Sequence, residues 1–290
     1  MNLEDVAGAT YGPYQMRISP EKVAEFVAAT GDEPGRWDQA APPGFAGALL
    51  FVVAPHFLAD SRVEPFTGIL VHVDQTFTWH GPLTVGAPIV VTGRVDKVRQ
   101  RGGRFFVTFS AAVDTPDGER LLDAVATFLM GRAEAPEAVD DLGEPPVRRR
   151  ELNETPSVAP RPDIGQPFPP MEKSASRLDL VKYAAASGDY NPIHLDHDAA
   201  RGAGLDGIVV HGLLMAAWVM QASAAISPRP DPIAHIKLRF RNALLPAVQS
   251  RVSGQVRDIA EDGTDARVTL AVTDDDQQLV TAQCVVRLEG

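Results

Sequence analysis

The hydrophobic pattern of the chain alternates between two kinds of segment. Two stretches, 44–58 and 212–226, are apolar almost throughout, and shorter helical patterns precede them at 19–34 and 178–186. A helix that is apolar on every side must be buried, so the two stretches predict central helices. Runs that alternate apolar and polar residues follow each stretch, and a period of two predicts strands with one buried face. The predicted strands lie at 70–82, 88–98, 104–113, 120–130, 235–242, 250–259, 265–272 and 278–288.

The predicted elements occur in the same order twice: helix, loop, apolar helix and four strands. Two pairs of residues mark the repeat. Asp32 and Asp189 are 157 residues apart, and Gly93 and Gly254 are 161 residues apart. The sequence therefore predicts an internal duplication with a period of about 160 residues.

Short turns rich in glycine and aspartate connect the predicted strands, as is typical of antiparallel neighbours. Each half must cover its own apolar helix, so we expect two curved antiparallel sheets, each wrapped around one helix. Pairing of the two sheets would also hide strand edges that otherwise promote aggregation. The predicted fold class is α+β, with two similar units in tandem.

Residues 131–170 differ from both halves. They hold nine of the 24 prolines and an Arg-Arg-Arg run at 148–150, with almost no hydrophobic periodicity. Proline-rich segments run extended and act as spacers. We therefore divide the chain into a first unit at 1–135, a linker at 136–170 and a second unit at 171–290.

The composition argues against several classes of protein. The chain has 290 residues, 44% hydrophobic and 22% charged, as in ordinary globular proteins. Neither apolar stretch is long enough to span a membrane, and a net charge of −11 disfavours nucleic acids and anionic membranes as partners. The N-terminus lacks a signal-peptide pattern, and the one cysteine, Cys284, cannot form an internal disulfide. A cytoplasmic location is therefore expected by default.

The segment Ser-Gly-Asp-Tyr-Asn-Pro-Ile-His, at 187–194, carries the candidate chemistry. Pro192 cannot continue a helix and favours an extended Asn191, so we expect the chain to turn between Asp189 and His194. Their side chains can then face one point, which residues five apart on a straight helix do not. A carboxylate and an imidazole that share one water molecule can exchange protons with it and with a neighbouring carbon. A solvated turn is the alternative, because Asp and Asn-Pro are common in turns.

A second candidate feature begins the apolar stretch at Gly212. The first N–H groups of a helix have no acceptor within it, and the helix dipole favours negative charge there. Gly212 is therefore a candidate oxyanion site, and glycine also lets a ligand approach the backbone closely. Asn191 and His211 are the candidate substrate-binding residues. Asn191 could also hold one member of the pair in place, and His211 could instead pack or cap beside Gly212.

The residues at 187–196, together with Gly-Ile-Val-Val-His-Gly-Leu-Leu at 207–214, resemble the signature of the MaoC-like, (R)-specific enoyl-CoA hydratases. The resemblance covers most of the second half, from Ser176 to about Leu288. The first half is similar to the degenerate N-terminal repeat of that family.

This resemblance implies a tandem hot-dog fold and the reversible addition of water to a trans-2-enoyl thioester, giving an (R)-3-hydroxyacyl thioester. It assigns catalysis to Asp189 and His194, and the oxyanion site to Gly212. Because the thioester itself is the substrate handle, no bound cofactor and no metal are expected.

The first half departs from the family pattern. Asp32 remains, but Trp37 stands five residues later, where the second half has His194. We therefore expect no chemistry in the first half. It could instead make room for a long or bulky acyl chain, since its apolar helix carries the small residues Gly44, Ala46, Gly47 and Ala48.

Two other functions stay open at this point: a hot-dog acyl thioesterase, and a non-catalytic partner subunit of a dehydratase. For an enzyme the expected partner is an acyl thioester. Coenzyme A is favoured as its carrier over an acidic acyl carrier protein, because the chain is itself acidic. Lys237, Arg239 and Arg241 could meet the phosphates of coenzyme A or could simply form a solvated strand face. A homodimer is compatible with the sequence but not required by it.

Overall fold

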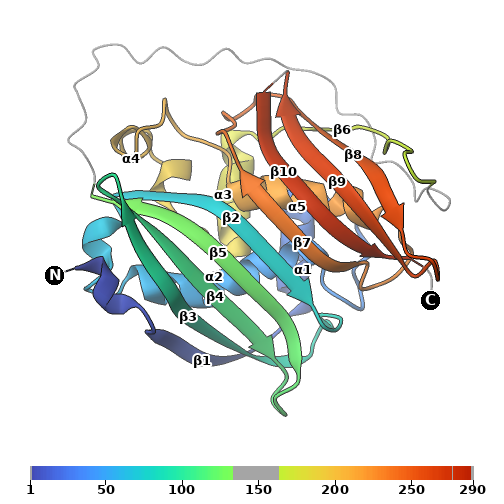
Figure 1. Ribbon diagram of the computed structural model, residues 1–290, viewed down its shortest axis with the longest axis horizontal. Coiled ribbons are helices and arrows are strands. Elements are labelled where there is room, and N and C mark those ends of the chain that lie inside the picture. The colour runs from blue at the N-terminus through green and yellow to red at the C-terminus, as the bar shows by residue number, and fades with distance from the viewer. Residues whose placement is uncertain (1, 133–162, 276, 289–290) are drawn as a thin grey trace.

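The computed structural model describes residues 2–132, 163–275 and 277–288 (Figure 1). The strands of the first half are β1 (Thr10–Arg17), β2 (Ile69–Trp79), β3 (Pro88–Arg101), β4 (Arg104–Asp114) and β5 (Arg120–Gly131). Those of the second half are β6 (Met171–Lys173), β7 (Ile233–Phe240), β8 (Ser250–Ile259), β9 (Asp265–Asp274) and β10 (Gln277–Arg287). The α-helices are α1 (Pro20–Thr30), α2 (Ala46–Leu58), α3 (Arg177–Ser187), α4 (His197–Gly202) and α5 (Gly212–Ala224).

The described strands form one antiparallel sheet in the order β1-β3-β4-β5-β2-β7-β10-β9-β8-β6. One half of the chain supplies the first five strands in this order, and the other half supplies the last five. The sheet curves around the helices, which lie on its inner side (Figure 1). Both apolar stretches form the predicted central helices, and α5 is buried over almost its whole length.

The two halves repeat each other in detail. Gly93 in β3 and Gly254 in β8 are each followed by a β-bulge that begins two residues later, at Val95 and at Val256. A Cβ added at Gly93 would lie 2.7 Å from the Phe109 side chain in β4. One added at Gly254 would lie 2.9 Å from the side chains of Leu270 in β9 and of Phe168. Real Cβ atoms do not approach so closely, because protein interiors are close-packed. The predicted tandem of two hot-dog units is therefore confirmed.

The two sheets join where β2 pairs with β7, in a register that runs from Asp74 opposite Arg239 to Thr78 opposite His235. Arg239 donates two hydrogen bonds to the Asp74 carboxylate, at 2.7 and 3.1 Å. At the other end, the Thr78 hydroxyl lies 3.0 Å from Nδ1 of His235. The join turns what would be two exposed edge strands into the centre of the sheet.

Small residues at the start of the first apolar stretch let the central helices approach each other. A Cβ on Gly44 would lie 3.0 Å from the Cβ of Ala217 in α5, and one on Gly47 would lie 3.4 Å from Leu213. Gly44 and Gly47 therefore bring the two halves into close contact. The small residues do not line the cavity described below, but later residues of the same helix do, so space for an acyl chain in the first half stays a prediction.

Strands β1 and β6 and the short helix α4 were not among the predicted elements, since each is short or lacks a clear period. The predicted linker, 136–170, lies largely outside the described residues, so its boundaries stay a prediction. Within its described part, Phe168 is buried and packs over Gly254. No helix among the described residues is long and apolar enough to cross a membrane.

Candidate active site

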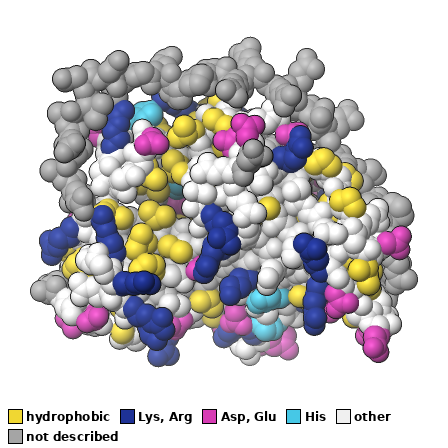
Figure 2. Space-filling view, turned by 45° about the horizontal axis from the view of Figure 1, so that its top comes forward, with side chains coloured by type: hydrophobic (Ala, Val, Ile, Leu, Met, Phe, Trp, Pro, Cys, Tyr) yellow, Lys and Arg dark blue, Asp and Glu magenta, His cyan; other side chains and the backbone are white. Residues whose placement is uncertain are grey.

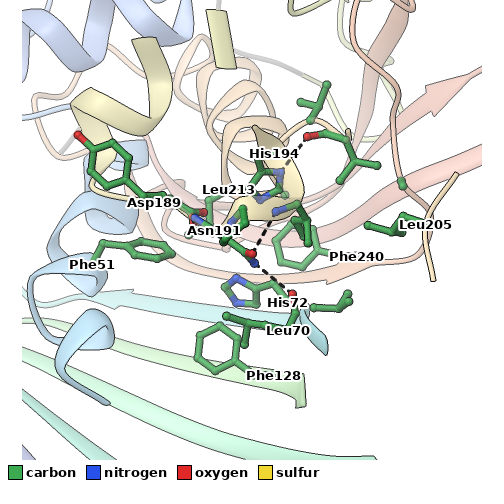
Figure 3. A pocket seen from close by; sticks show the side chains of 18 of the residues that line it. Phe51, Leu70, His72, Phe128, Asp189, Asn191, His194, Leu205, Leu213 and Phe240 are labelled. Atoms are coloured by element: carbon green, nitrogen blue, oxygen red, sulfur yellow. Dashed lines mark hydrogen bonds between the residues drawn. The ribbon is translucent and has the colours of Figure 1, made fainter. Parts of the chain in front are cut away.

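The loop after α3 positions the candidate acid–base pair. Helix α3 ends at Gly188, whose left-handed φ of 80° turns the chain, and the Ser187 hydroxyl accepts the N–H of Asp189 at 3.2 Å. A 3-10 turn follows at Pro192–His194, and the side chain of Asn191 caps it by accepting a backbone N–H at 3.3 Å. These two turns are the chain reversal predicted from the proline, and they bring the carboxylate and the imidazole together (Figure 3).

Three buried side chains meet at this point. One carboxylate oxygen of Asp189 and one ring nitrogen each of His194 and His211 all lie within 4.8 Å of one another. Two hydrogen bonds of about 2.8 Å to one water molecule, at a tetrahedral angle, span about 4.6 Å. A separation below this limit allows one water molecule to bridge Asp189 and His194. Their exposed fractions are only 7% and 6%.

The His194 ring has a defined tautomer. Its Nδ1 lies 2.8 Å from the backbone carbonyl oxygen of Val209. A carbonyl only accepts hydrogen bonds, so Nδ1 carries the proton and Nε2 of the neutral ring keeps a free lone pair. Burial lowers the pKa of His194 to about 4, and the Val209 carbonyl opposes this fall only in part. The ring is therefore neutral at pH 7 and can accept a proton.

The Asp189 carboxyl is shifted in the opposite direction. Burial raises its pKa to about 7, and the hydrogen bond from the N–H of Asn191, at 3.4 Å, offsets only part of the rise. A carboxyl group with a pKa near neutrality can both donate and accept a proton under ordinary conditions.

His211 lies behind the pair and is fully buried. Its Nε2 donates to the backbone carbonyl of Asp189 at 3.1 Å, and its ring stacks on that of His194 with 3.8 Å between centroids. The cavity wall includes Val210 and Gly212, which flank His211 in the chain, but it does not include His211 itself. His211 is therefore better placed to position the acid–base pair than to touch a substrate.

Asp189, His194 and His211 also belong to the residue types that hold metal ions. Imidazole coordinates a metal through a lone pair in the ring plane. The two rings are stacked with only 26° between their planes, so their lone pairs run side by side and do not converge on one point. The geometry suits proton transfer better than coordination.

Gly212 is the first residue of α5 and lines the same cavity. The N–H at this position has no acceptor within the helix. A Cβ added there would lie 3.2 Å from two ring atoms of Phe240, so a side chain would crowd the cavity wall. Gly212 thus leaves a backbone donor accessible at the positive end of a buried helix.

Asn191 fastens this loop to the first half of the chain. Its side-chain amide donates to the backbone carbonyl of Leu70 in β2 at 3.1 Å (Figure 3). Both ends of the amide are therefore used within the protein, although the residue also lines the cavity. Neither bond goes to Asp189 or His194, so the side chain holds the loop to β2 and does not hold a member of the pair directly.

A cavity of about 590 Å³ leads to the site, and both halves of the chain form its wall. The second half contributes the loop and the start of α5, together with Phe240 at the end of β7. The first half contributes Phe51, Pro55, Leu58, Ala59, Thr67, Leu70, Val71, His72 and Phe128. The local sequence pattern does not mark these first-half residues, because their exposure to the cavity depends on how the halves pair.

The loop after α1, which corresponds to the loop after α3, makes packing and capping contacts and has no acid–base pair among its described residues. Asp32 follows α1 as Asp189 follows α3, and Trp37 is buried at 3% exposure where a histidine would be needed. Between them, Arg36 donates to the carbonyls of Ala224 and Ser227, at 2.7 and 2.9 Å, and so caps the end of α5. The first half lacks the acid–base pair, as its sequence predicts.

Basic and acidic side chains are interspersed over the face seen in Figure 2. Lys237, Arg239 and Arg241 are the cations that could meet the phosphates of coenzyme A. Arg239 forms an ion pair with Asp74. Arg241 is exposed, donates to the Thr281 hydroxyl at 3.2 Å, and lies both in the cavity wall and in the shallow groove on the outer sheet face.

Comparison with known proteins identifies relatives of both halves of the chain. A model of the MaoC like domain matches residues 159–277, and a model of the FAS1-like dehydratase domain region matches residues 5–124. A UPF0336 protein of Cutibacterium acnes is 30% identical over 133 residues, which cover 44% of this chain and 92% of that protein. The 3-hydroxyacyl-thioester dehydratase X of Mycobacterium tuberculosis is 25% identical over 235 residues, covering 80% of this chain and 75% of that protein.

Among solved structures, one described as a MaoC-like dehydratase superposes with a TM-score of 0.81 at 21% identity, covering 99% of this chain and 100% of the other. At that identity the match concerns the fold. Together with the sequence matches, it places both halves in one architecture. The chain belongs to the MaoC-like dehydratase family.

Proposed function

We propose that this protein is a hydro-lyase that adds water reversibly to a trans-2-enoyl thioester, giving the (R)-3-hydroxyacyl thioester. One observation carries the proposal. A buried carboxylate and a buried neutral imidazole lie within 4.8 Å of each other, beside the free N–H at the start of α5 and in the wall of a largely apolar cavity.

The protonation states fit a pair that shares one proton. In hydration, the water oxygen attacks the β-carbon while Nε2 of His194 takes a proton from that water. The carboxyl group of Asp189 gives its proton to the α-carbon. The proton on His194 then returns to the Asp189 carboxylate. That return is downhill, because the pKa of Asp189 is about 7 and that of His194 about 4. Dehydration follows the same path backwards.

Gly212 serves the thioester oxygen in this scheme. Negative charge develops on that oxygen as the β-carbon is attacked, and a preorganised N–H at a helix start stabilises it. His211 and Asn191 act as positioning residues. His211 holds the backbone of Asp189 and the ring of His194, and Asn191 ties the loop to β2.

The remaining assignments concern the partners. We propose coenzyme A as the carrier of the acyl group, with exposed Arg241 at the cavity wall near its phosphates. A homodimer and a cytoplasmic location stay predictions from the sequence. The (R) configuration of the product comes from the family and needs its own test.

A thioesterase of the same fold is the second candidate function, and a non-catalytic partner subunit is the third. Hydrolysis also needs water near the thioester, and the same cavity would hold the acyl chain. The site favours hydration, because two groups that can transfer protons lie close enough to act on one water molecule. A partner subunit would not need the pair at all.

Incubation of the purified single chain with crotonyl-CoA separates these functions. Hydration removes the enoyl absorbance without releasing free thiol, and chiral analysis then identifies the 3-hydroxy product. Free thiol release would establish the thioesterase. Absence of both reactions, with longer and bulkier enoyl-CoA substrates as well, would contradict the proposal and favour the partner subunit.

A further inference from the structure

A shallow groove crosses the outer face of the second-half sheet, and the proposed acid–base chemistry does not use it. It has a volume of about 800 Å³ and extends over β7, β10, β9 and β8, on the side that faces away from the helices (Figure 1). Arg241 lines this groove and also lines the cavity of the candidate active site. The groove and the cavity therefore meet at one side chain.

The groove is positively charged. The described residues that line it include four exposed cations, Lys237, Arg239, Arg241 and Arg257, and no carboxylate. Of these four, only Arg239 forms an ion pair within the described part of the chain, with Asp74, which does not line the groove. The chain as a whole carries a net charge of −11, so this groove is an exception on an acidic protein. A concave surface with positive charge alone attracts anionic ligands.

Threonine hydroxyls hold two of the arginines in place. Nε of Arg257 donates to the Thr269 hydroxyl at 2.8 Å, and Nε of Arg241 donates to the Thr281 hydroxyl at 3.2 Å. A guanidinium that is fixed through Nε still has two terminal nitrogens, and their N–H groups match the oxygens of a phosphate. Both arginines are therefore partly ordered for phosphate binding before a ligand arrives.

A row of polar side chains crosses the groove between these cations. Lys237 lies opposite Gln283 in the sheet, Gln283 lies opposite Thr269, and Thr269 lies opposite Gln255. Residues directly opposite each other share one face of a sheet. The row covers three strand spacings, about 14 Å. Amide and hydroxyl groups spread over this length can hydrogen-bond a sugar and a base, so the groove offers more than charge.

We propose that the groove binds the phosphorylated nucleotide of coenzyme A while the thioester lies in the cavity. Coenzyme A carries a diphosphate beside its pantetheine arm and a third phosphate on the ribose. The diphosphate would lie at Arg241 and Lys237, and the ribose phosphate at Arg257. The inference rests on the proposed hydration, and it adds to Arg241 two cations that lie outside the cavity.

The shape of the groove favours a nucleotide over a carrier protein. Both carriers present the acyl group on a pantetheine arm with a phosphate at its end, so both could use Arg241. The remaining negative charge of an acidic carrier protein lies on carboxylates of a folded surface. The cations here line a groove that also contains Gln283 and Gln255, and a small ligand can enter such a groove more fully than a folded domain can.

The test compares crotonyl-CoA with crotonyl-pantetheine, which has the same thioester but no nucleotide. For the wild type we expect kcat/KM to be about 30-fold higher for crotonyl-CoA, roughly threefold for each of the three cations without an ion pair. In Lys237→Gln/Arg257→Gln this advantage should fall about tenfold, through a higher KM for crotonyl-CoA at an unchanged kcat. The kinetics with crotonyl-pantetheine should not change. High salt should also reduce the wild-type advantage, because exposed charges are screened.

Arg251→Gln/Arg267→Gln is the matched control. It removes two charges from the same sheet, at residues that pair with Glu172 and Asp258 and do not line the groove. This variant should keep the full advantage of crotonyl-CoA.

Three results would overturn the inference although the hydratase proposal stands. They are equal kcat/KM for the two substrates in the wild type, equal losses for both substrates in Lys237→Gln/Arg257→Gln, and a preference for crotonyl-acyl carrier protein over crotonyl-CoA that this variant loses. If no thioester is hydrated, the proposed function itself fails. Calorimetric binding of free coenzyme A then still tests the groove: a Kd about tenfold weaker in the variant supports the inference, and an unchanged Kd contradicts it.

Discussion

The imidazole rings of His194 and His211 are stacked with 3.8 Å between their centroids, and each donates to a different backbone carbonyl. These two contacts fix the position and the tautomer of each ring. Burial and the neighbouring His194 both lower the pKa of His211. Two stacked rings that resist protonation leave Asp189 as the group that stores the proton in the proposed reaction, from which it would pass to the α-carbon.

Removal of either member of the pair should abolish most of the activity. We expect Asp189→Asn and His194→Gln each to lower kcat/KM about 1,000-fold or more, with the double variant little worse, because the two groups act as one unit. Loss of enoyl absorbance measures the rate. Asp198→Asn, at a carboxylate that is 90% exposed, is the control and should retain full activity. Small, additive losses would show that the pair is misassigned.

Activity should follow the one-proton form of the pair. With pKa values of about 4 for His194 and about 7 for Asp189, kcat/KM should be bell-shaped in pH. It should fall below about pH 4, as His194 becomes protonated, and above about pH 7, as Asp189 loses its proton. A pH–rate profile of the free enzyme measures both limbs. A flat profile from pH 5 to pH 9 would contradict the assigned protonation states.

The buried carboxyl group of Asp189 should lower the free energy of unfolding at alkaline pH, where it is ionised. Its pKa is about 7 when folded and about 3.9 in an unfolded chain, so the folded protein binds the proton more tightly and loses stability as pH rises from about 4 to about 7. We expect Asp189→Asn to raise the free energy of unfolding by roughly 1–4 kcal/mol at pH 8, and by little at pH 4. Urea unfolding at the two pH values measures this. An equal effect at both would show that the carboxyl group is not shifted.

A methyl group at Gly212 should impair catalysis without removing the N–H. In Gly212→Ala the new Cβ would lie 3.2 Å from the Phe240 ring and crowd the approach of the thioester. We expect kcat to fall about 100-fold or more, in line with the loss of one oxyanion donor. The double variant with Phe240→Leu relieves the crowding against the ring. Its recovery to full activity would show that the loss came from crowding against Phe240. Full activity in Gly212→Ala itself would show that the thioester does not approach this part of the backbone.

The link between Asn191 and Leu70 should affect both stability and rate. Asn191→Ala leaves the Leu70 carbonyl and one backbone N–H without their side-chain partner. We expect a loss of about 1–3 kcal/mol in the free energy of unfolding, together with a lower kcat, because the loop that carries both catalytic residues is released. Thermal unfolding and steady-state kinetics report the two effects. Loss of stability with an unchanged kcat would show that the loop holds its shape without this contact.

The sequence predicts the fold closely because the periods of its apolar residues survive in the structure. The apolar stretch at 212–226 becomes α5, and the run at 250–259 is β8 to the residue. The catalytic loop is also predictable, since Pro192 and Gly188 impose turns through local backbone geometry. Both features depend on neighbours in the chain.

Contacts between distant segments are not predictable in the same way. The stacking of His211 on His194 joins residues 17 apart through a loop, and His72 of the first half lines a cavity whose candidate chemistry lies in the second half. The close contacts of Gly44 and Gly47 are likewise not evident from the sequence, because their neighbour is a helix more than 160 residues away. Such features follow from how the two halves pair, and a single sequence carries little information about pairing.

The join of β2 with β7 unites two similar units of one polypeptide in a single sheet. In a symmetric dimer, any substitution that widens the acyl pocket would also appear beside the reacting groups, since every chain must supply both. Here the first half supplies a large part of the wall, whereas the proposed chemistry lies in the second half, so the two are encoded separately. Substrate range can thus drift through substitutions in the first 132 residues while the reaction centre stays intact, which makes that segment the natural target for altering what the enzyme accepts.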